Sequence, residues 1–315
     1  MITSVFKKSS PINYTVVTLL VFALFIVSQI KQGNWLNSTM NTVTSASIFI
    51  LLFASLFLTN FIVKKNGLTK NSSYSILFFA LFLMFFPSVL TNFRLIVANF
   101  FILLALRRLV SLQTLKAPKE KIFDASLWIF AASLFHYWAI LFILLVYISI
   151  IYHVSRDYRN WLIPFVSLFA TAIIYLIVVL ALNIDFMGNI ATFTAFDFRM
   201  DYFTNTYQNL ALSMFTVVGI YFLFSKITSL TNRPLVLQAS YKKIIFTFII
   251  GVVIFVISPN KSNDVLLFTF FPLAVMASNA VEYSKNKPYQ EVVIALTIVL
   301  VFLSFFLQLQ FTSVG

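Results

Sequence analysis

Cysteine is absent from the chain, and histidine occurs only twice, at His136 and His153. The absence of cysteine excludes disulfides, thiol catalysis and cysteine-ligated metals. With only two histidines, a histidine-rich metal site is not expected either. The sequence also lacks a P-loop and the patterns G-x-G-x-x-G, H-E-x-x-H and G-x-S-x-G, which mark nucleotide-binding proteins, zinc proteases and α/β-hydrolases. We therefore predict no metal and no cofactor.

Charged residues are scarce as well. They make up 10% of the 315 residues, whereas 61% are hydrophobic and the mean hydropathy is +0.96. A soluble domain has no means of hiding that much apolar surface, so the sequence predicts a polytopic membrane protein. We expect an all-α bundle of transmembrane helices that forms a single membrane domain over residues 1–315, without an internal repeat or a soluble domain.

Acidic residues are the scarcer of the two charge types. Nine Asp and Glu stand against 22 Lys and Arg, which gives a net charge of +13. Such an excess would suggest nucleic-acid binding in a soluble protein. In this chain the basic residues cluster between apolar runs, where they set the orientation of the chain and contact anionic lipids. Membrane lipids are therefore an expected partner, and nucleic acid is not.

The apolar runs are long enough to cross a bilayer. The first run, 13–30, could be mistaken for a signal peptide, but it is long for an apolar signal core and has no small-x-small cleavage site. We therefore interpret it as a retained helix. The other runs are 42–63, 74–90, 94–109, 121–154, 161–182, 208–225, 243–258, 264–283 and 292–309.

The run 121–154 has to be assigned one crossing or two. As a single helix it would extend about 51 Å at ~1.5 Å per residue, against a hydrocarbon core of ~30 Å. If it turns near His136 and crosses twice, 18 of the 22 Lys and Arg lie inside and 4 lie outside. If it crosses once, the distribution becomes 12 against 10 and the bias is lost. The positive-inside rule therefore favours two short helices and eleven crossings, with the N-terminus inside and the C-terminus outside.

The outer side then collects polar residues from four short segments. Its longest loop, 183–207, is rich in aromatic residues and is a candidate lid. Ionisable groups at membrane depth are expensive, so they mark binding or catalytic sites more often than surface groups do. The outer polar residues are Arg94, His136, Asp197, Arg199, Asp201, Asn260, Lys261, Asn263 and Asp264.

Two of these residues have the clearest candidate roles. Arg94 is suited to bind a phosphate or diphosphate through bidentate hydrogen bonds, and the alternative is an interfacial arginine that snorkels at a helix end. His136 is suited to act as a general base because the ordinary pKa of histidine is near neutrality. Its alternative is a buried histidine that bonds a backbone carbonyl at a helix break. His153 falls at the cytoplasmic end, and we interpret it as an interface residue.

The remaining candidates have comparably strong structural alternatives. Arg199, flanked by Asp197 and Asp201, is either a second phosphate clamp or a member of a local ion-pair cluster. Lys261 and Asp264 either pair with each other or bind a ligand, but their segment also has the composition of a turn and helix cap.

One part of the chain resembles a known family. Arg94 opens a helix through 98–106, a basic loop follows, and the next hairpin contains Ala131-Ala132-Ser133-Leu134-Phe135-His136. This pattern resembles the EpsG/Wzy-type polysaccharide polymerases over residues 91–151, and the rest of the chain resembles them in hydropathy only. In length and hydropathy the whole chain also resembles an uncharacterised family of flavobacterial inner-membrane proteins.

The resemblance implies metal-independent glycosyl transfer at the outer face of the bacterial inner membrane, from a sugar carried on polyprenyl phosphate or diphosphate. It implies that Arg94 binds the donor phosphate, that His136 activates or orients the acceptor hydroxyl, and that Arg199 is a second arginine of the site. The outer loop is shorter than in that family, where a larger loop usually helps to shape the saccharide site. A single transfer, or a member without activity, is therefore an alternative to long-chain polymerisation.

Two other functions are compatible with the sequence. A non-enzymatic membrane subunit of a secretion or envelope-assembly complex would fit the 39 phenylalanines and the scarcity of buried charge, with envelope proteins as partners. A transporter or lipid flippase ranks third, because transporters usually place ionisable residues near the bilayer midplane and show repeat symmetry.

Overall fold

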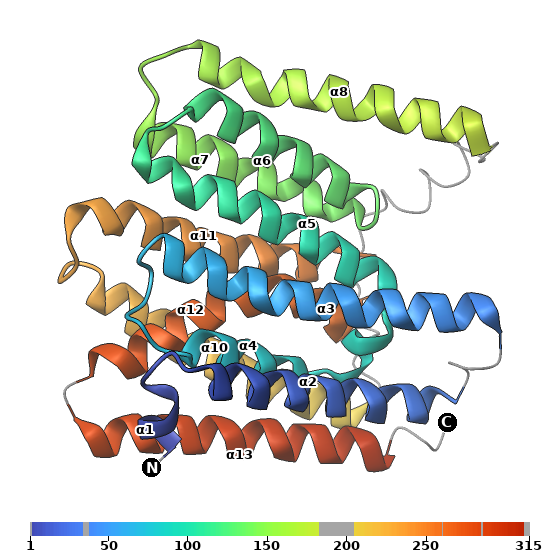
Figure 1. Cartoon of the computed structure of the whole chain (residues 1–315), viewed down its shortest axis with the longest axis vertical. Coiled ribbons are helices and arrows are strands. Elements are labelled where there is room, and N and C mark those ends of the chain that lie inside the picture. The colour runs from blue at the N-terminus through green and yellow to red at the C-terminus, as the bar shows by residue number, and fades with distance from the viewer. Residues whose placement is uncertain (1, 34–37, 183–204, 260, 285, 312–315) are drawn as a thin grey trace.

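The computed structural model describes residues 2–33, 38–182, 205–259, 261–284 and 286–311, and every regular element in these ranges is a helix. The helices lie side by side with their axes roughly aligned (Figure 1). The α-helices are α1 (Ile2–Phe6), α2 (Pro11–Gln32), α3 (Thr39–Lys65), α4 (Tyr74–Phe85), α5 (Phe93–Val110), α6 (Pro118–Ser133), α7 (Ile143–His153), α8 (Arg159–Leu182), α10 (Thr206–Ser229), α11 (Leu235–Ile257), α12 (Leu267–Tyr283) and α13 (Lys287–Phe311). The 3-10 helices are η1 (Pro87–Thr91), η2 (Ser111–Thr114), η3 (Tyr137–Phe142) and η4 (Asn263–Leu266).

Among the described residues, eight helices are long and apolar enough to cross a membrane. They are α2, α3, α5, α8, α10, α11, α12 and α13. The helix α4 and the segment formed by η3 and α7 are shorter but also apolar, and α6 has 16 residues. The predicted all-helical architecture is confirmed, and the eight helices have the length and composition of a membrane protein.

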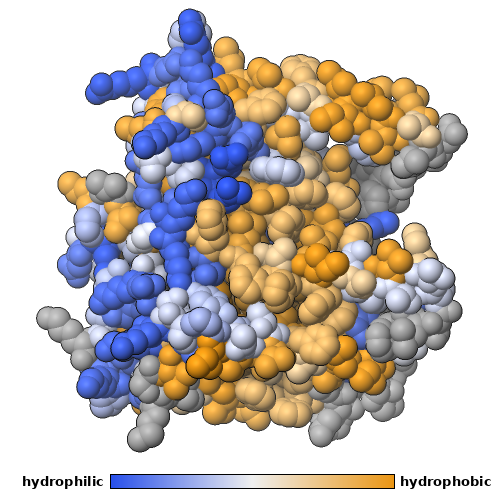
Figure 2. All heavy atoms as spheres, in the orientation of Figure 1, coloured by the Kyte–Doolittle hydropathy of each residue, from blue (hydrophilic) through white to orange (hydrophobic). Residues whose placement is uncertain are grey.

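The connections between helices gather at two ends of the bundle (Figure 1). One end holds α1 and the connections α3–α4, α5–α6, α7–α8, α10–α11 and α12–α13, and we call it the basic end. The opposite end holds the break between α4 and α5, the turn between α6 and η3, the connection between α11 and η4, and the end of α13. In Figure 2, hydrophilic surface forms a band along the basic end and hydrophobic surface covers the middle of the bundle.

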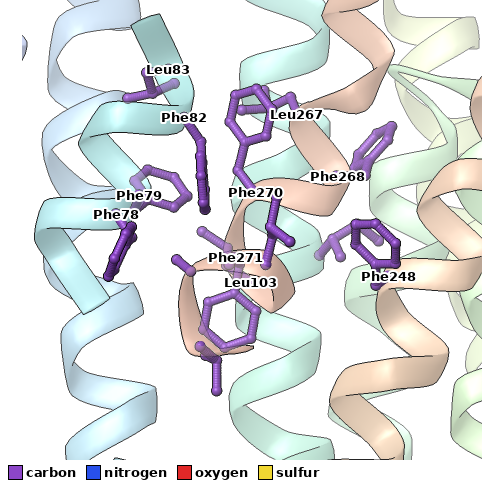
Figure 3. Close-up of a cluster of buried hydrophobic side chains, with 14 of the residues drawn as sticks. Phe78, Phe79, Phe82, Leu83, Leu103, Phe248, Leu267, Phe268, Phe270 and Phe271 are labelled. Carbon is purple, nitrogen blue, oxygen red and sulfur yellow. The ribbon is translucent and has the colours of Figure 1, made fainter. Parts of the chain in front are cut away.

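The helix α4 lies inside the bundle. All of its residues are buried, and it contacts α2, α3, α10, α12 and α13. Phenylalanines of α4 and α12 lie across from one another (Figure 3), and the ring centroids of Phe82 and Phe270 are 6.4 Å apart. Lipid is as apolar as these side chains, so burial alone gives little drive for helix association in a membrane. Close ring packing contributes about 0.5–1.5 kcal/mol per aromatic pair in soluble proteins. We therefore attribute much of the stability of the contact between α4 and α12 to these ring pairs.

Hydrogen bonds join the segments that flank α4 to α12 and η4 at both ends of the helix pair. At the basic end, the Glu282 carboxylate accepts from the Ser72 hydroxyl and from the Lys70 backbone N–H at 2.7 Å. At the opposite end, the Asp264 carboxylate accepts from the Ser88 hydroxyl and from Asn92 Nδ2 at 3.3 Å. Each carboxylate fixes one end of the central pair, because a charged acceptor strengthens both hydrogen bonds.

The break after α4 is stabilised by side chains from other helices. The helix ends just before Pro87, which has no N–H to continue the ladder. The carbonyl of Phe85 instead accepts from Gln308 Nε2 at 2.6 Å and from the Ser304 hydroxyl at 3.1 Å, and the carbonyl of Leu90 accepts from Gln29 Nε2 at 3.3 Å. Unpaired carbonyls at membrane depth are costly, so these donors allow the helix to stop inside the bundle.

The helix break predicted near His136 is confirmed. The helix α6 ends at Ser133, η3 begins at Tyr137, and α6 packs against both η3 and α7. The N–H of His136 donates to the Ala132 carbonyl at 3.0 Å, and its own carbonyl accepts from Ala139 at 2.9 Å. These two bonds close the chain into a tight turn.

The start of α11 corrects the predicted run 243–258. The helix begins at Leu235, so Lys243 lies inside it and is buried instead of occupying a cytoplasmic loop. Its Nζ donates to the Leu109 carbonyl at 2.6 Å and lies 3.1 Å from Nε2 of His153. Lys226 of α10 is buried as well. The scarcity of buried charge, which supported a packing subunit, therefore does not hold for α10 and α11.

Candidate functional site

Among the described residues, three of the four 3-10 helices, η1, η3 and η4, lie at the end opposite the basic end. The helix α4 breaks there, α5, η3 and η4 begin there, and α11 ends there. Non-helical backbone at membrane depth is tolerated where protein encloses it or where it lines a cavity, and broken helices form substrate sites in many membrane proteins.

The segment 258–264 links the predicted residues of this end. At its start, Oγ of Ser258 lies 3.2 Å from Nε2 of His136. At its end, Asp264 accepts a hydrogen bond from Asn92, two residues before Arg94. Lys261 lies between these two contacts and is 8% exposed. The segment that carries Lys261 therefore contacts both the turn that bears His136 and the helix start that bears Arg94.

The hydrogen bonds of Ser258 determine which nitrogen of His136 carries the proton. The Ser258 hydroxyl donates its one proton to the Ile254 carbonyl at 2.7 Å. It therefore accepts from His136, so Nε2 carries the hydrogen and Nδ1 bears the lone pair. In the described part of the structure, Nδ1 makes no hydrogen bond.

The His136 ring lies in an apolar environment. It is half-buried, and its centroid is 5.5 Å from that of Phe268. Burial lowers the pKa of His136 to about 4, because the charged imidazolium loses its hydration. At neutral pH the ring is uncharged, and Nδ1 is available to accept a proton.

Arg94 is the second residue of α5 and is exposed. The start of this helix is fixed by Asn92, whose side chain accepts from the Leu95 N–H at 3.3 Å and also donates to Asp264. A helix N-terminus presents N–H groups and the positive end of the helix dipole, so it favours anions. An arginine in this position adds a full positive charge and a bidentate donor for phosphate.

The contacts of Asp264 favour a positioning role over the predicted ligand-binding role. The residue is 8% exposed, and its two carboxylate oxygens are occupied separately, by Ser88 and by Asn92. It thereby holds η1 and the start of α5 against η4, and it orients the helix that bears Arg94.

A row of aromatic side chains follows α5 and α6 away from this end. Phe101 lies two turns after Arg94 on the same face of α5, and its ring stacks on Trp128 with centroids 5.5 Å apart. The Phe101 ring is also 5.8 Å from the ring of Phe135, the residue before His136. All three side chains are partly exposed, so this aromatic row offers an apolar surface beside the polar end.

The other predicted site residues fall outside the described residues. They are Asp197, Arg199, Asp201 and Asn260. The predicted lid 183–207 is described only at its end, where the Asn205 side chain accepts from the N–H groups of Tyr207 and Gln208 and caps α10.

Sequence reasoning missed three residues of this end, Ser88, Asn92 and Ser258. Asn92 had a signal, because an asparagine directly before an apolar run is a common helix N-cap. The two serines had none of their own, although each is next to a proline at the end of an apolar run.

A family of unknown function, DUF6427, matches residues 5–313. The chain belongs to this family. No curated protein and no solved structure matches the chain. The description of DUF6427 gives no activity and no link to polysaccharide polymerases, so the function of this DUF6427 protein has to be argued from the site itself.

Proposed function

We propose that this protein transfers a sugar from a polyprenyl-phosphate carrier to an acceptor hydroxyl, at the outer face of the bacterial inner membrane. The observation that supports it most is the link through 258–264 between the turn bearing His136 and the helix start bearing Arg94. A cation for the donor phosphate and a neutral imidazole for the acceptor hydroxyl are the two groups that such a transfer needs in the absence of a metal.

The proposed topology has eleven crossings, made by α2 to α8 and α10 to α13, with η3 and α7 counted as one. The N-terminus then lies in the cytoplasm and the C-terminus outside. Two features support this arrangement: the connections gather at two ends of the bundle (Figure 1), and the hydrophilic surface concentrates at the basic end (Figure 2). The positive-inside rule assigns the basic end to the cytoplasm.

In the proposed reaction, the acceptor oxygen attacks the anomeric carbon of the donor sugar. The bond between that carbon and the phosphate oxygen breaks, and the polyprenyl phosphate leaves with the electron pair. Nδ1 of His136 takes the proton of the acceptor hydroxyl. Arg94 and Lys261 oppose the negative charge that grows on the leaving phosphate, and that charge raises the pKa of His136 as the proton arrives.

The aromatic row of Phe101, Trp128 and Phe135 gives the carrier lipid a surface to follow. It starts beside the turn that bears His136 and continues along α5 and α6 toward the middle of the bundle. An isoprenoid chain is apolar and branched, so it would lie against these rings while its phosphate reaches Arg94.

The test uses purified protein in proteoliposomes with a polyprenyl phosphate-linked sugar as donor. His136→Gln keeps an amide N–H in place of Nε2 for Ser258 but removes Nδ1, so we expect a folded protein whose rate falls about 10²–10⁴-fold. Arg94→Gln should lower the rate to a similar degree. His153→Gln, at the basic end, is the matched control and should keep the wild-type rate.

Normal product from both His136→Gln and Arg94→Gln would reject the proposal. The same pair of variants separates it from the alternative of a non-enzymatic subunit of an envelope-assembly complex, which predicts tolerance of both substitutions and stable co-purification with partner chains.

A further inference from the structure

At the basic end, far along the chain from the proposed active site, two cations lie against two tyrosine rings. Nζ of Lys226, near the end of α10, is 3.1 Å from the centre of the Tyr241 ring. The guanidinium carbon of Arg233, in the connection to α11, is 3.2 Å from the centre of the Tyr283 ring. The Tyr241 hydroxyl donates to the Leu68 carbonyl at 2.8 Å, which fixes the orientation of that ring.

Neither cation has a polar side-chain partner in the part of the chain that the structure describes. Lys226 is 1% exposed, and both its Nζ and Nε of Arg233 are buried without a hydrogen-bond partner. Neither residue forms an ion pair within the described ranges. A cation–π contact recovers only part of the free energy that a cation loses when it leaves water. No close ion pair among the described residues therefore neutralises either cation.

The nearby carboxylate of Glu282 acts on both cations through space but supplies only part of the opposing charge. Its carboxylate is already bonded to the Ser72 hydroxyl and the Lys70 backbone N–H. Nζ of Lys70 bonds the Glu282 carbonyl at 3.2 Å and lies 4.7 Å from the centre of the Tyr283 ring. Lys70, Lys226 and Arg233 thus surround one carboxylate. The charges of Lys70, which is exposed, and Arg233, which is half-buried, already exceed it, so the cluster carries a net positive charge.

We propose that this cluster of Lys226, Arg233, Tyr241 and Tyr283 binds the phosphate group of an anionic phospholipid. A guanidinium stacked on an aromatic ring keeps its N–H edge available for bidentate hydrogen bonds to phosphate. The nitrogen of Lys226 lies buried behind this position and adds a favourable dipole or charge for the same anion without touching it. Basic sites between transmembrane helices at the cytoplasmic side are known to bind anionic headgroups.

The exposure of the cluster fits a headgroup ligand. Lys226 and Tyr241 form its buried floor, Arg233 and Tyr283 are half-buried, and Lys70 is exposed. The cluster therefore reaches the surface at the basic end, where the molecule is hydrophilic (Figure 2). A phosphate at this level can reach Arg233 and Lys70 while its acyl chains stay beside the apolar helices.

The experiment measures lipid binding to the full-length purified protein. Delipidated protein is titrated with vesicles of phosphatidylglycerol or of phosphatidylcholine, and bound lipid is counted by native mass spectrometry. We expect phosphatidylglycerol to be retained at least tenfold more strongly than phosphatidylcholine. Lys226→Met and Arg233→Gln should each weaken the retention of phosphatidylglycerol about tenfold. Lys242→Gln removes the same charge one residue from Tyr241 and should change retention less than twofold.

A second arm adds inorganic phosphate in place of vesicles and follows thermal stability. Protection that depends on Lys226 and Arg233 supports the same anion site and shows that it also takes free phosphate. Because Arg233 lies in a connection and not in a helix, Arg233→Gln keeps the test valid if Lys226→Met fails to fold. Unchanged retention and unchanged protection in Arg233→Gln, or equal losses in Arg233→Gln and Lys242→Gln, would overturn the proposal.

Discussion

Ser258 accepts a hydrogen bond from Nε2 of His136, because the serine hydroxyl donates its own proton to the Ile254 carbonyl. The serine stands at the end of α11 and the histidine at the turn after α6, so the bond joins two segments that are far apart in the sequence. Because Nε2 is the donor in this hydrogen bond, Nδ1 of His136 bears the lone pair. A single serine thereby selects the tautomer of the imidazole.

Stability should depend on pH through His136. Burial lowers its pKa to about 4, whereas an unfolded chain protonates histidine near pH 6.5. Between these values the unfolded state binds more protons, so the folded state loses stability as the pH falls from about 6.5 toward 4. The melting temperature in detergent should therefore drop more between pH 7 and pH 5 in the wild type than in His136→Gln. Equal drops in the two proteins would contradict the predicted burial.

Removal of the Asp264 carboxylate should loosen the start of α5. In Asp264→Ala the Ser88 hydroxyl and the Asn92 amide lose their partner. Because Ser88 is exposed and Asn92 is half-buried, water replaces part of what is lost, and we expect a destabilisation of about 1 kcal/mol. Asp264→Asn keeps an acceptor oxygen and should cost less. Thermal unfolding of both variants measures the difference, and a wild-type melting temperature in Asp264→Ala would show that the two donors find other partners.

The helices α11 and α12 pack closely at Gly251. A Cβ at this position would lie 2.8 Å from Cγ2 of Thr269, so Gly251→Ala should cost about 1–3 kcal/mol. Thr269→Ser removes that methyl group and keeps the hydroxyl that donates to Leu266. The double variant should therefore recover most of the loss, and absence of recovery would place the clash elsewhere. Gly219→Ala, which meets only the ring of Phe248 at 3.3 Å, is the milder comparison.

Cysteine labelling can test whether α6 makes a complete membrane crossing by itself, separate from η3 and α7. The chain has no native cysteine, so single substitutions give no background. Leu115→Cys lies before α6 and Leu134→Cys directly after it, and the native side chains are 58% and 48% exposed. In intact cells a membrane-impermeant maleimide should label position 134 and not position 115. Labelling of both positions, or of position 115 alone, would reject the proposed topology.

The turn at His136 could be predicted because loop charges record the side of the membrane on which each loop lies. The early start of α11 could not. Lys242 and Lys243 read as a loop end in the sequence, but Lys243 is buried against the Leu109 carbonyl and His153. These contacts join residues that are far apart in the sequence, so no local sequence pattern predicts them. The hydrogen bonds from Ser88 to Asp264 and between His136 and Ser258 were hidden for the same reason, since each spans more than a hundred residues.

The enclosure of α4 also bears on biogenesis. The helix leaves the ribosome early, yet α10, α12 and α13, which cover much of its surface, are translated in the last third of the chain. Until these helices are inserted, acyl chains at the translocon must surround the phenylalanines of α4. The hydrogen bond from Gln308 to the Phe85 carbonyl also cannot form before then. Nascent chains that stop before α12 should therefore hold α4 against lipid, and maturation of the bundle ends with the exchange of those acyl chains for protein.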